Sequence, residues 1–183
     1  MKLTDTALPG VQLIEPTVFN DEWGCFYESF NLDRFRSVVG QPEIDFVQDN
    51  HSVSKAGVLR GIHYQKNPMA QGKLVRVLIG EIFDVAVDLR RDSKFFGRCV
   101  SMFLSASNRK QLWIPEGFGH GFLALSEKVE VLYKTTNYYS SANEVCIRWD
   151  DPDLGIEWPK LEQPYAVSEK DAKGIELGQA EFF

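Results

Sequence analysis

Hydrophobic residues along the chain occur mainly in short runs rich in β-branched and aromatic residues, separated by glycine, proline and polar residues. Runs of this length and composition are typical of β-strands, and the residues between them are typical of turns. The pattern therefore predicts an all-β fold, an antiparallel barrel or jelly roll. The expected strands cover residues 11–15, 25–30, 46–53, 73–79, 82–89, 99–104 and 129–139.

The connections add detail to this prediction. Gly80 and Glu81 are expected to close a β-hairpin between residues 73–79 and 82–89. Asn31 as N-cap and Gly40 as stop predict one short helix over residues 32–39, and a second can begin near Ser168. Because the chain contains no internal repeat, low-complexity segment or linker, residues 1–183 are expected to form a single domain whose C-terminal segment packs back on the barrel.

Alternation along the strands predicts which polar side chains point inward. Lys73 has the same parity as Val75, and Tyr133 has the same parity as Val131. If these faces line the core, an ammonium group and a phenol enter the same cavity. The strand that carries His63 has apolar residues on both parities, so either orientation of that imidazole is compatible with the pattern.

Composition and charge exclude several functional classes. The formal net charge of −6 argues against duplex nucleic acid or an anionic membrane as a partner, since both require an extended basic face. The three cysteines, Cys25, Cys99 and Cys146, are odd in number and form no CxxC pair, which predicts neither a disulfide framework nor a thiolate metal site. With no apolar signal region and no membrane-length segment, we expect a cytoplasmic protein.

Two of the three histidines lie beside glycines in predicted strand segments. His63 is in GVLRGIHYQ (57–65), and His120 is in IPEGFGHGF (114–122). Glycine allows tight bends or the close approach of a ligand, so these histidines are expected to face a shared, polar interior. A β-barrel with a polar pocket would hold them.

Five longer motifs follow one another along the chain: FVQDNHS (46–52), LRGIH (59–63), QGKLVR (71–76), QLWIPEGF (111–118) and LYK (132–134). Read in order, they resemble the dTDP-4-dehydrorhamnose 3,5-epimerases over roughly residues 11–174. This resemblance implies a cupin-type jelly roll that is usually a homodimer and acts on the dTDP-linked 4-keto-6-deoxy sugar dTDP-4-dehydro-6-deoxy-D-glucose, without a cofactor or metal.

Epimerisation beside a ketone needs a base, a group that stabilises the enolate, and an acid on the opposite face. By resemblance, His63 is the base, and Asp171 orients its imidazole and stabilises the imidazolium. Lys73 is expected to place positive charge beside the C4 oxygen, and Tyr133 to return the proton. Taken singly, each residue has an ordinary structural interpretation, and only their joint occurrence favours catalysis.

The resemblance also assigns binding residues. Tyr139 is expected to stack on thymine, and the fixed fork of donors on Arg60 suits a phosphate. One position departs from the family, because Trp23 stands where an arginine usually contributes to the diphosphate clamp. The residues assigned to polar contacts with the sugar nucleotide are Glu28, Gln48, Asn50, Arg60, His120, Glu144 and Lys170.

Three alternatives stay open. The segment 115–120 resembles a second cupin motif, which points to a metal-dependent cupin with a glutamate before the second histidine, but Gln65 stands where a first motif would supply the other histidine of its His-x-His pair. A non-catalytic sugar-nucleotide binder would need the pocket and no proton-transfer groups, which the joint presence of His63 and Tyr133 argues against. An epimerase that inverts only C3 or only C5 of a related nucleotide ketosugar has the same sequence requirements.

Overall fold

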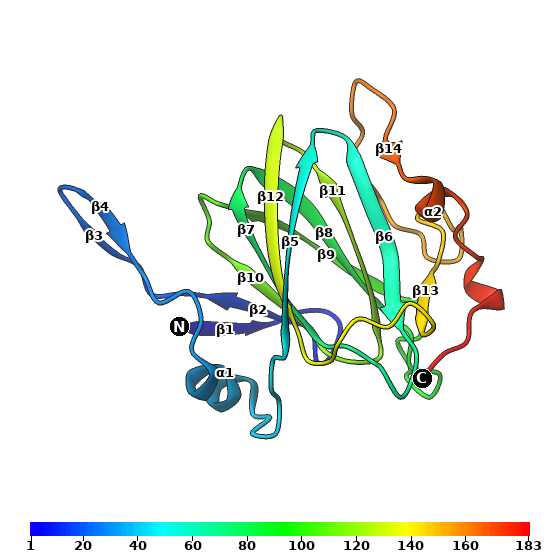
Figure 1. Cartoon of the computed structure of the whole chain (residues 1–183), viewed down its shortest axis with the longest axis horizontal. Coiled ribbons are helices and arrows are strands. Elements are labelled where there is room, and N and C mark those ends of the chain that lie inside the picture. Colours follow the sequence, from blue (N-terminus) through cyan, green and yellow to red (C-terminus); the bar gives the residue numbers. More distant parts are fainter.

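A computed structural model describes residues 1–183 and contains two antiparallel sheets that face each other (Figure 1). The prediction of an all-β, antiparallel fold is therefore confirmed. In spatial order, the first sheet contains β1 (Lys2–Asp5), β2 (Gln12–Glu15), β10 (Gln111–Ile114), β7 (Lys73–Ile79), β12 (Lys128–Thr135) and β5 (Gln48–Lys55). The second contains β13 (Glu144–Cys146), β6 (Val58–Gln65), β11 (Phe118–Ala124), β8 (Glu81–Asp88) and β9 (Cys99–Ser105), and β14 (Ala166–Val167) pairs in parallel with β6.

The expected hairpin at Gly80 is wrong. Strands β7 and β8 lie in different sheets, because β7 pairs with β10 and β12 whereas β8 pairs with β9 and β11. Both edges of each strand are thus occupied, and Gly80 carries the chain from one sheet to the other. A tight glycine turn has the same local signature whether its strands pair side by side or face each other across a core.

Three apolar clusters hold the layers together. The largest lies between the sheets and includes Val75 and Val131 from the first sheet and Phe118 from the second. Another covers the outer face of the second sheet, where the C-terminal segment buries Leu177. Burying apolar surface in this way stabilises the folded state by roughly 25 cal/mol per Å² of surface removed from water. The C-terminal segment is held on the second sheet by these apolar contacts. A hydrogen bond adds to them, because the hydroxyl of Tyr64 on β6 donates to the Glu181 carbonyl at 2.6 Å.

The helices are short. Helix α1 (Leu32–Val39) begins where the Asn31 side chain accepts a hydrogen bond from the Arg34 N–H, and ends at Gly40 in the left-handed conformation (φ 72°). It buries Phe35 against Trp113 on the outer face of the first sheet, with ring centroids 5.1 Å apart. Helix α2 (Glu169–Ala172) is capped by Ser168, and a 3-10 turn, η1 (Leu177–Gln179), follows. None of these helices has the length and apolar character needed to cross a membrane.

A two-stranded ribbon projects from the body of the molecule (Figure 1). It consists of β3 (Phe19–Asp21) and β4 (Gly24–Phe26). The expected strand over residues 25–30 is therefore shorter, and the expected strand over 129–139 also ends early, at Thr135. Trp23 at the ribbon's tip has an exposed fraction of 86%. A tryptophan taken alone is most often a packing residue, but Trp23 is not packed within its own chain.

Candidate functional site

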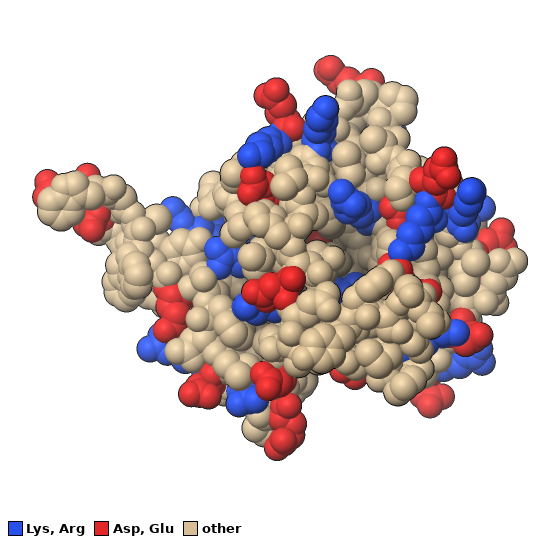
Figure 2. Space-filling model, viewed as in Figure 1, with Lys and Arg blue, Asp and Glu red and all other residues tan.

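A polar cavity of about 290 Å³ opens between the two sheets. Only 4 of its 18 lining residues are hydrophobic. Figure 2 shows the hollow near the middle of the molecule, with basic side chains around its rim. All the residues predicted to form the site line this cavity except Glu28; they are Gln48, Asn50, Arg60, His63, Lys73, His120, Tyr133, Tyr139, Glu144, Lys170 and Asp171.

Both sheets contribute to the cavity. From the first sheet, β7 supplies Lys73 and β12 supplies Tyr133, whose inward orientation follows from the parity predicted for them. From the second sheet, β6 supplies His63 and β13 supplies Glu144. Asp171 comes from neither sheet. It lies on α2, which the C-terminal segment packs against β6. The imidazole and the phenol therefore approach the cavity from opposing layers.

The orientation of His63, which alternation left open, depends on an irregularity at Gly61. The pairing of β6 with β11 shifts register between His120 and Phe122. As a result, Arg60 and His63 both line the cavity although their parities differ. Gly61 has φ 115°, and a Cβ there would lie 2.5 Å from the Cα of Gly121. Only glycine fits this position.

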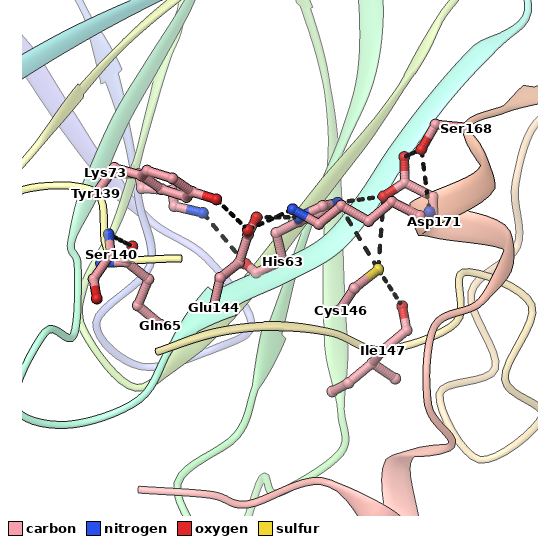
Figure 3. Close-up of polar contacts among 11 residues, drawn as sticks. His63, Gln65, Lys73, Tyr139, Ser140, Glu144, Cys146, Ile147, Ser168 and Asp171 are labelled. Carbon is pink, nitrogen blue, oxygen red and sulfur yellow. Dashed lines mark hydrogen bonds and ion pairs between the residues drawn. The ribbon is translucent and has the colours of Figure 1, made fainter. Parts of the chain in front are cut away.

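His63 is held by carboxylates on both sides of its ring (Figure 3). Its Nε2 makes a very short hydrogen bond with Asp171 Oδ1, and its Nδ1 lies 3.1 Å from Glu144 Oε1. Burial alone would lower the pKa of His63, but hydrogen bonds with Asp171, Cys146 and Glu144 outweigh it and raise that pKa to about 10. At neutral pH the imidazole in this arrangement is therefore an imidazolium.

Glu144 is the shared partner of three side chains. Besides His63, its carboxylate accepts hydrogen bonds from the hydroxyl of Tyr139, at 2.7 Å, and from the ammonium of Lys170. The hydrogen bond from His63 holds the pKa of Glu144 well below its usual range, against the opposing effect of burial, and Lys170 and Tyr139 add to the decrease. Glu144 thus remains ionised, and its hydrogen bonds hold the side chains of Tyr139 and Lys170 at the mouth of the cavity.

Asp171 is placed by the start of α2. It is buried, and the Ser168 hydroxyl donates to its Oδ2 at 2.8 Å while the Asp171 N–H donates to Ser168 Oγ at 3.1 Å. Burial alone would raise the pKa of Asp171, but the hydrogen bond from His63 outweighs it and lowers that pKa. Asp171 therefore stays ionised beside the imidazole.

Lys73 and Tyr133 have altered proton affinities for the same main reason. Burial lowers the pKa of Lys73 to about 8, and the negative charges of Glu144 and Asp84 limit the fall. The Lys73 ammonium donates to the His63 carbonyl oxygen at 3.3 Å. Burial also raises the pKa of the Tyr133 phenol, and the charge of Arg60 opposes this effect. At neutral pH the cavity thus contains a buried cation and a protonated phenol.

Asp84 is a functional candidate that the sequence interpretation missed. Its Oδ1 lies 2.7 Å from His120 Nε2, and its Oδ2 is buried without a hydrogen-bond partner. The signal was present in the chain, since Asp84 shares parity with Ile82 and Ala86 and is the one polar residue between the charged ends of the strand. A carboxylate on the core face of a buried strand requires a partner.

Glu28 lies outside the cavity. Its carboxylate accepts a hydrogen bond from Asn31 at 3.2 Å and pairs with Arg34 at 3.2 Å, next to the projecting ribbon. Trp23, at the ribbon's tip, is also outside the cavity of its own chain. Neither residue can contact a molecule bound there without a rearrangement or a second copy.

The ligand set expected of a metal-dependent cupin does not assemble. His63 and His120 lie opposite each other on neighbouring strands. Glu116, however, accepts a hydrogen bond from the Thr136 hydroxyl at 3.2 Å and lines a different hollow. The glutamate of the 115–120 segment therefore does not lie beside the two histidines.

Known proteins resemble this chain over nearly its whole length. The family model for dTDP-4-dehydrorhamnose 3,5-epimerase matches residues 5–179. The dTDP-4-dehydrorhamnose 3,5-epimerase of Salmonella typhimurium is 54% identical over 180 residues, covering 98% of this chain and 97% of that protein. The enzyme of the same name from Pseudomonas aeruginosa is 54% identical, covering 100% of this chain and 99% of that protein.

A solved structure of a protein with a related name also resembles this chain. The fold resembles that of the dTDP-6-deoxy-D-glucose-3,5-epimerase of Legionella pneumophila, solved in complex with dTDP-4-keto-L-rhamnose, with a TM-score of 0.94 and 46% sequence identity. The alignment covers 98% of this chain and 94% of that one. The expected cupin-type jelly roll is thereby confirmed. On sequence and structure together, the chain belongs to the dTDP-4-dehydrorhamnose 3,5-epimerase family.

Proposed function

We propose that the protein epimerises dTDP-4-dehydro-6-deoxy-D-glucose at C3 and C5 to give dTDP-4-dehydro-L-rhamnose. The observation that carries this proposal is one cavity lined by the imidazole of His63, the phenol of Tyr133 and the ammonium of Lys73. These groups match the base, acid and enolate stabiliser that inversion beside a ketone requires.

The geometry supports Nδ1 as the basic atom of His63. Asp171 holds Nε2, so the nitrogen left to receive a proton from carbon is Nδ1. In the structure Nδ1 faces Glu144, and the imidazole is charged. On this proposal, substrate binding draws Glu144 away from Nδ1, which removes one of the interactions that raise the pKa, and the proton on that nitrogen passes to solvent before the sugar is deprotonated. A sugar hydroxyl that donates to Glu144 would have this effect.

Removal of the proton at C3 or C5 moves charge onto the C4 oxygen. Lys73 is 8% exposed and retains a proton at neutral pH. Because the buried surroundings have a low dielectric constant, its ammonium stabilises the negative charge on the C4 oxygen strongly. Tyr133 faces the cavity from the other sheet and donates its proton to the opposite face of the enolate. The ketone activates both neighbouring carbons, so the same groups serve two inversions after the ring shifts.

The remaining cavity residues are proposed to bind the nucleotide sugar. Arg60 would pair with the diphosphate, and Tyr139, whose ring is exposed beside the mouth, would stack on thymine. Hydrogen-bonding groups for the sugar and phosphates would come from Gln48, Asn50, His120, Glu144 and Lys170. We include no metal or other cofactor in the reaction.

A homodimer is also part of the proposal. Phe19 and Phe26 on the projecting ribbon are 63% and 71% exposed, and a second copy would bury them. The same arrangement would give Glu28 and Trp23 a ligand to contact, in the cavity of that second copy. The three free cysteines support a cytoplasmic location, where thiols remain reduced.

Turnover in deuterated water tests the reaction. Incubation with dTDP-4-dehydro-6-deoxy-D-glucose should place deuterium at C3 and C5 of a product with the L-rhamno configuration, measured by NMR. Label at a single carbon would instead identify a single-centre epimerase, and the absence of label at either carbon would contradict the proposal.

Variants connect the reaction to particular residues. His63→Ala should abolish exchange, whereas His51→Ala, at an exposed histidine outside the cavity, should not. Equal exchange in both variants would exclude His63 as the base.

A further inference from the structure

Behind the imidazole of His63, three metal-binding atoms of different chemistry converge. They are His63 Nε2, Cys146 Sγ and Asp171 Oδ1, all within 4.8 Å of one another. They come from β6, β13 and α2, so the tertiary fold brings them together (Figure 3). Cys146 does not line the cavity and has no part in the proposed proton transfers.

The separations suit a tetrahedral ion. With metal–ligand bonds of about 2.0 to 2.3 Å, neighbouring ligand atoms in a tetrahedral zinc site lie roughly 3.3 to 3.6 Å apart. Here Cys146 Sγ is 3.6 Å from Asp171 Oδ1 and 3.9 Å from His63 Nε2. Nε2 and Oδ1 are closer because a proton joins them, and that proton is the one a metal would replace.

The surroundings already hold the ligands in orientation. The second ring nitrogen of His63 faces Glu144 at 3.1 Å, which is the carboxylate–histidine contact that usually supports a metal-binding imidazole. The Ser168 hydroxyl binds the other oxygen of Asp171 at 2.8 Å, leaving Oδ1 available. Asp171 is 3% exposed, so few water molecules compete for it.

We propose that His63, Cys146 and Asp171 form an inhibitory site for Zn²⁺ or a similar borderline-soft divalent ion. The thiolate and imidazole select such ions over Mg²⁺ and Ca²⁺, which prefer oxygen ligands. Binding replaces the thiol proton of Cys146 and the proton on Nε2, and both are released to solvent. Three protein ligands leave a fourth position for water.

The expected consequence rests on the proposed function. A metal on Nε2 separates the imidazole from Asp171 and withdraws electron density from the ring, so Nδ1 becomes a poorer base. Zinc should therefore lower kcat, and EDTA should restore it. Because Cys146 lies outside the cavity that would hold the substrate, the effect on KM should be smaller than the effect on kcat.

Cobalt provides a test that does not depend on turnover. Titration with Co²⁺ should give one thiolate-to-metal charge-transfer band per chain, with the visible bands of a tetrahedral ion. The band should disappear in Cys146→Ser and Cys146→Ala and persist in Cys25→Ser, whose thiol is exposed on the ribbon. Thermal melting without metal would verify that the variants are folded.

Zinc inhibition gives the second measurement. Half-inhibition of Cys146→Ser should need at least about 10-fold more Zn²⁺ than the parent protein, since loss of a ligand costs no less than loss of a supporting contact. Absence of the charge-transfer band in the parent protein, or its persistence in folded Cys146→Ser, would overturn the site. A Cys146-dependent band in a protein without epimerase activity would instead refute the proposed function alone.

Discussion

The contact between Asp171 and His63 leads to a prediction that can be measured without substrate. The substitution Asp171→Asn keeps the shape of the side chain and removes its charge. The pKa of His63 should then fall, because burial still disfavours the imidazolium while the largest of the interactions that raise the pKa is gone. The Ser168 contact that orients this side chain can be kept by the amide.

The size of the effect follows from the pKa. A rise from 6.5 to about 10 corresponds to roughly 5 kcal/mol of preference for the imidazolium, at about 1.4 kcal/mol per pH unit. The His63 side chain is 23% exposed, so solvent screening leaves most of this energy in place. Asp171 shares the effect with Cys146 and Glu144, and its removal should lower the pKa by more than either of theirs.

Histidine NMR would measure this change. The chain contains only three histidines, so ¹³C-labelled imidazoles give few signals, and the His63→Ala variant assigns the relevant one. In the parent protein His63 should titrate far above pH 7, and in Asp171→Asn it should titrate at lower pH. An unchanged or higher pKa in the variant would refute the reasoning.

The same contact makes the stability of the parent protein depend on pH. The folded-state pKa of His63 lies above the unfolded-state value of 6.5, so the stabilisation is complete below pH 6.5 and is lost as the pH rises through about 10. The folded-state pKa of Asp171 is lowered, so its stabilisation is present above about pH 3.8 and is lost at lower pH. The unfolding free energies of parent and Asp171→Asn should therefore differ most between about pH 4 and 6.5.

Four further substitutions give separate tests. Tyr133→Phe should lower kcat by about 10²- to 10⁴-fold while the exposed Tyr138→Phe control stays unaffected; equal rates would exclude the phenol as acid. Asp84→Asn should raise KM, because the imidazole of His120 loses its charged partner, and an unchanged KM would contradict that role. Gly61→Ala should lower the thermal midpoint by several degrees, since its Cβ meets Gly121 at 2.5 Å, whereas a parent-like midpoint would show that the strands can separate. Trp23→Arg should tighten dTDP binding by roughly 10-fold through one added charged contact, and equal or weaker affinity by calorimetry would refute this.

Local signals in the sequence predicted the local structure well. Helix α1 begins and ends at the predicted residues because Asn31 and Gly40 satisfy its ends within a few residues of sequence. Strand alternation placed Lys73 and Tyr133 correctly, since β7 and β12 are regular where these residues lie and bury one face against the other sheet.

The remaining features depend on contacts between distant segments. The connection at Gly80 could not be assigned from its own residues, because the partners of β7 and β8 come from elsewhere in the chain. The orientation of His63 required knowledge of the register shift against β11. Asp84 lies among apolar residues of β8, and only the folded structure shows that the His120 side chain is within hydrogen-bond distance of it. The position of Glu28 depends on the path of the ribbon.

The proposed proton acceptor, His63, and the proposed proton donor, Tyr133, come from different sheets, and this has a mechanical consequence. The gap that a sugar ring must bridge is set by the thickness of the apolar filling between those layers, which includes Leu104 and Val131. Replacing such a side chain by a smaller one would let the two sheets move closer together or tilt. Displacing the reacting groups by about 1 Å can lower the reaction rate 10²-fold. On the proposed mechanism, stereochemical fidelity therefore depends on interior packing, and substitutions of residues that never touch the sugar are expected to alter which face is reprotonated.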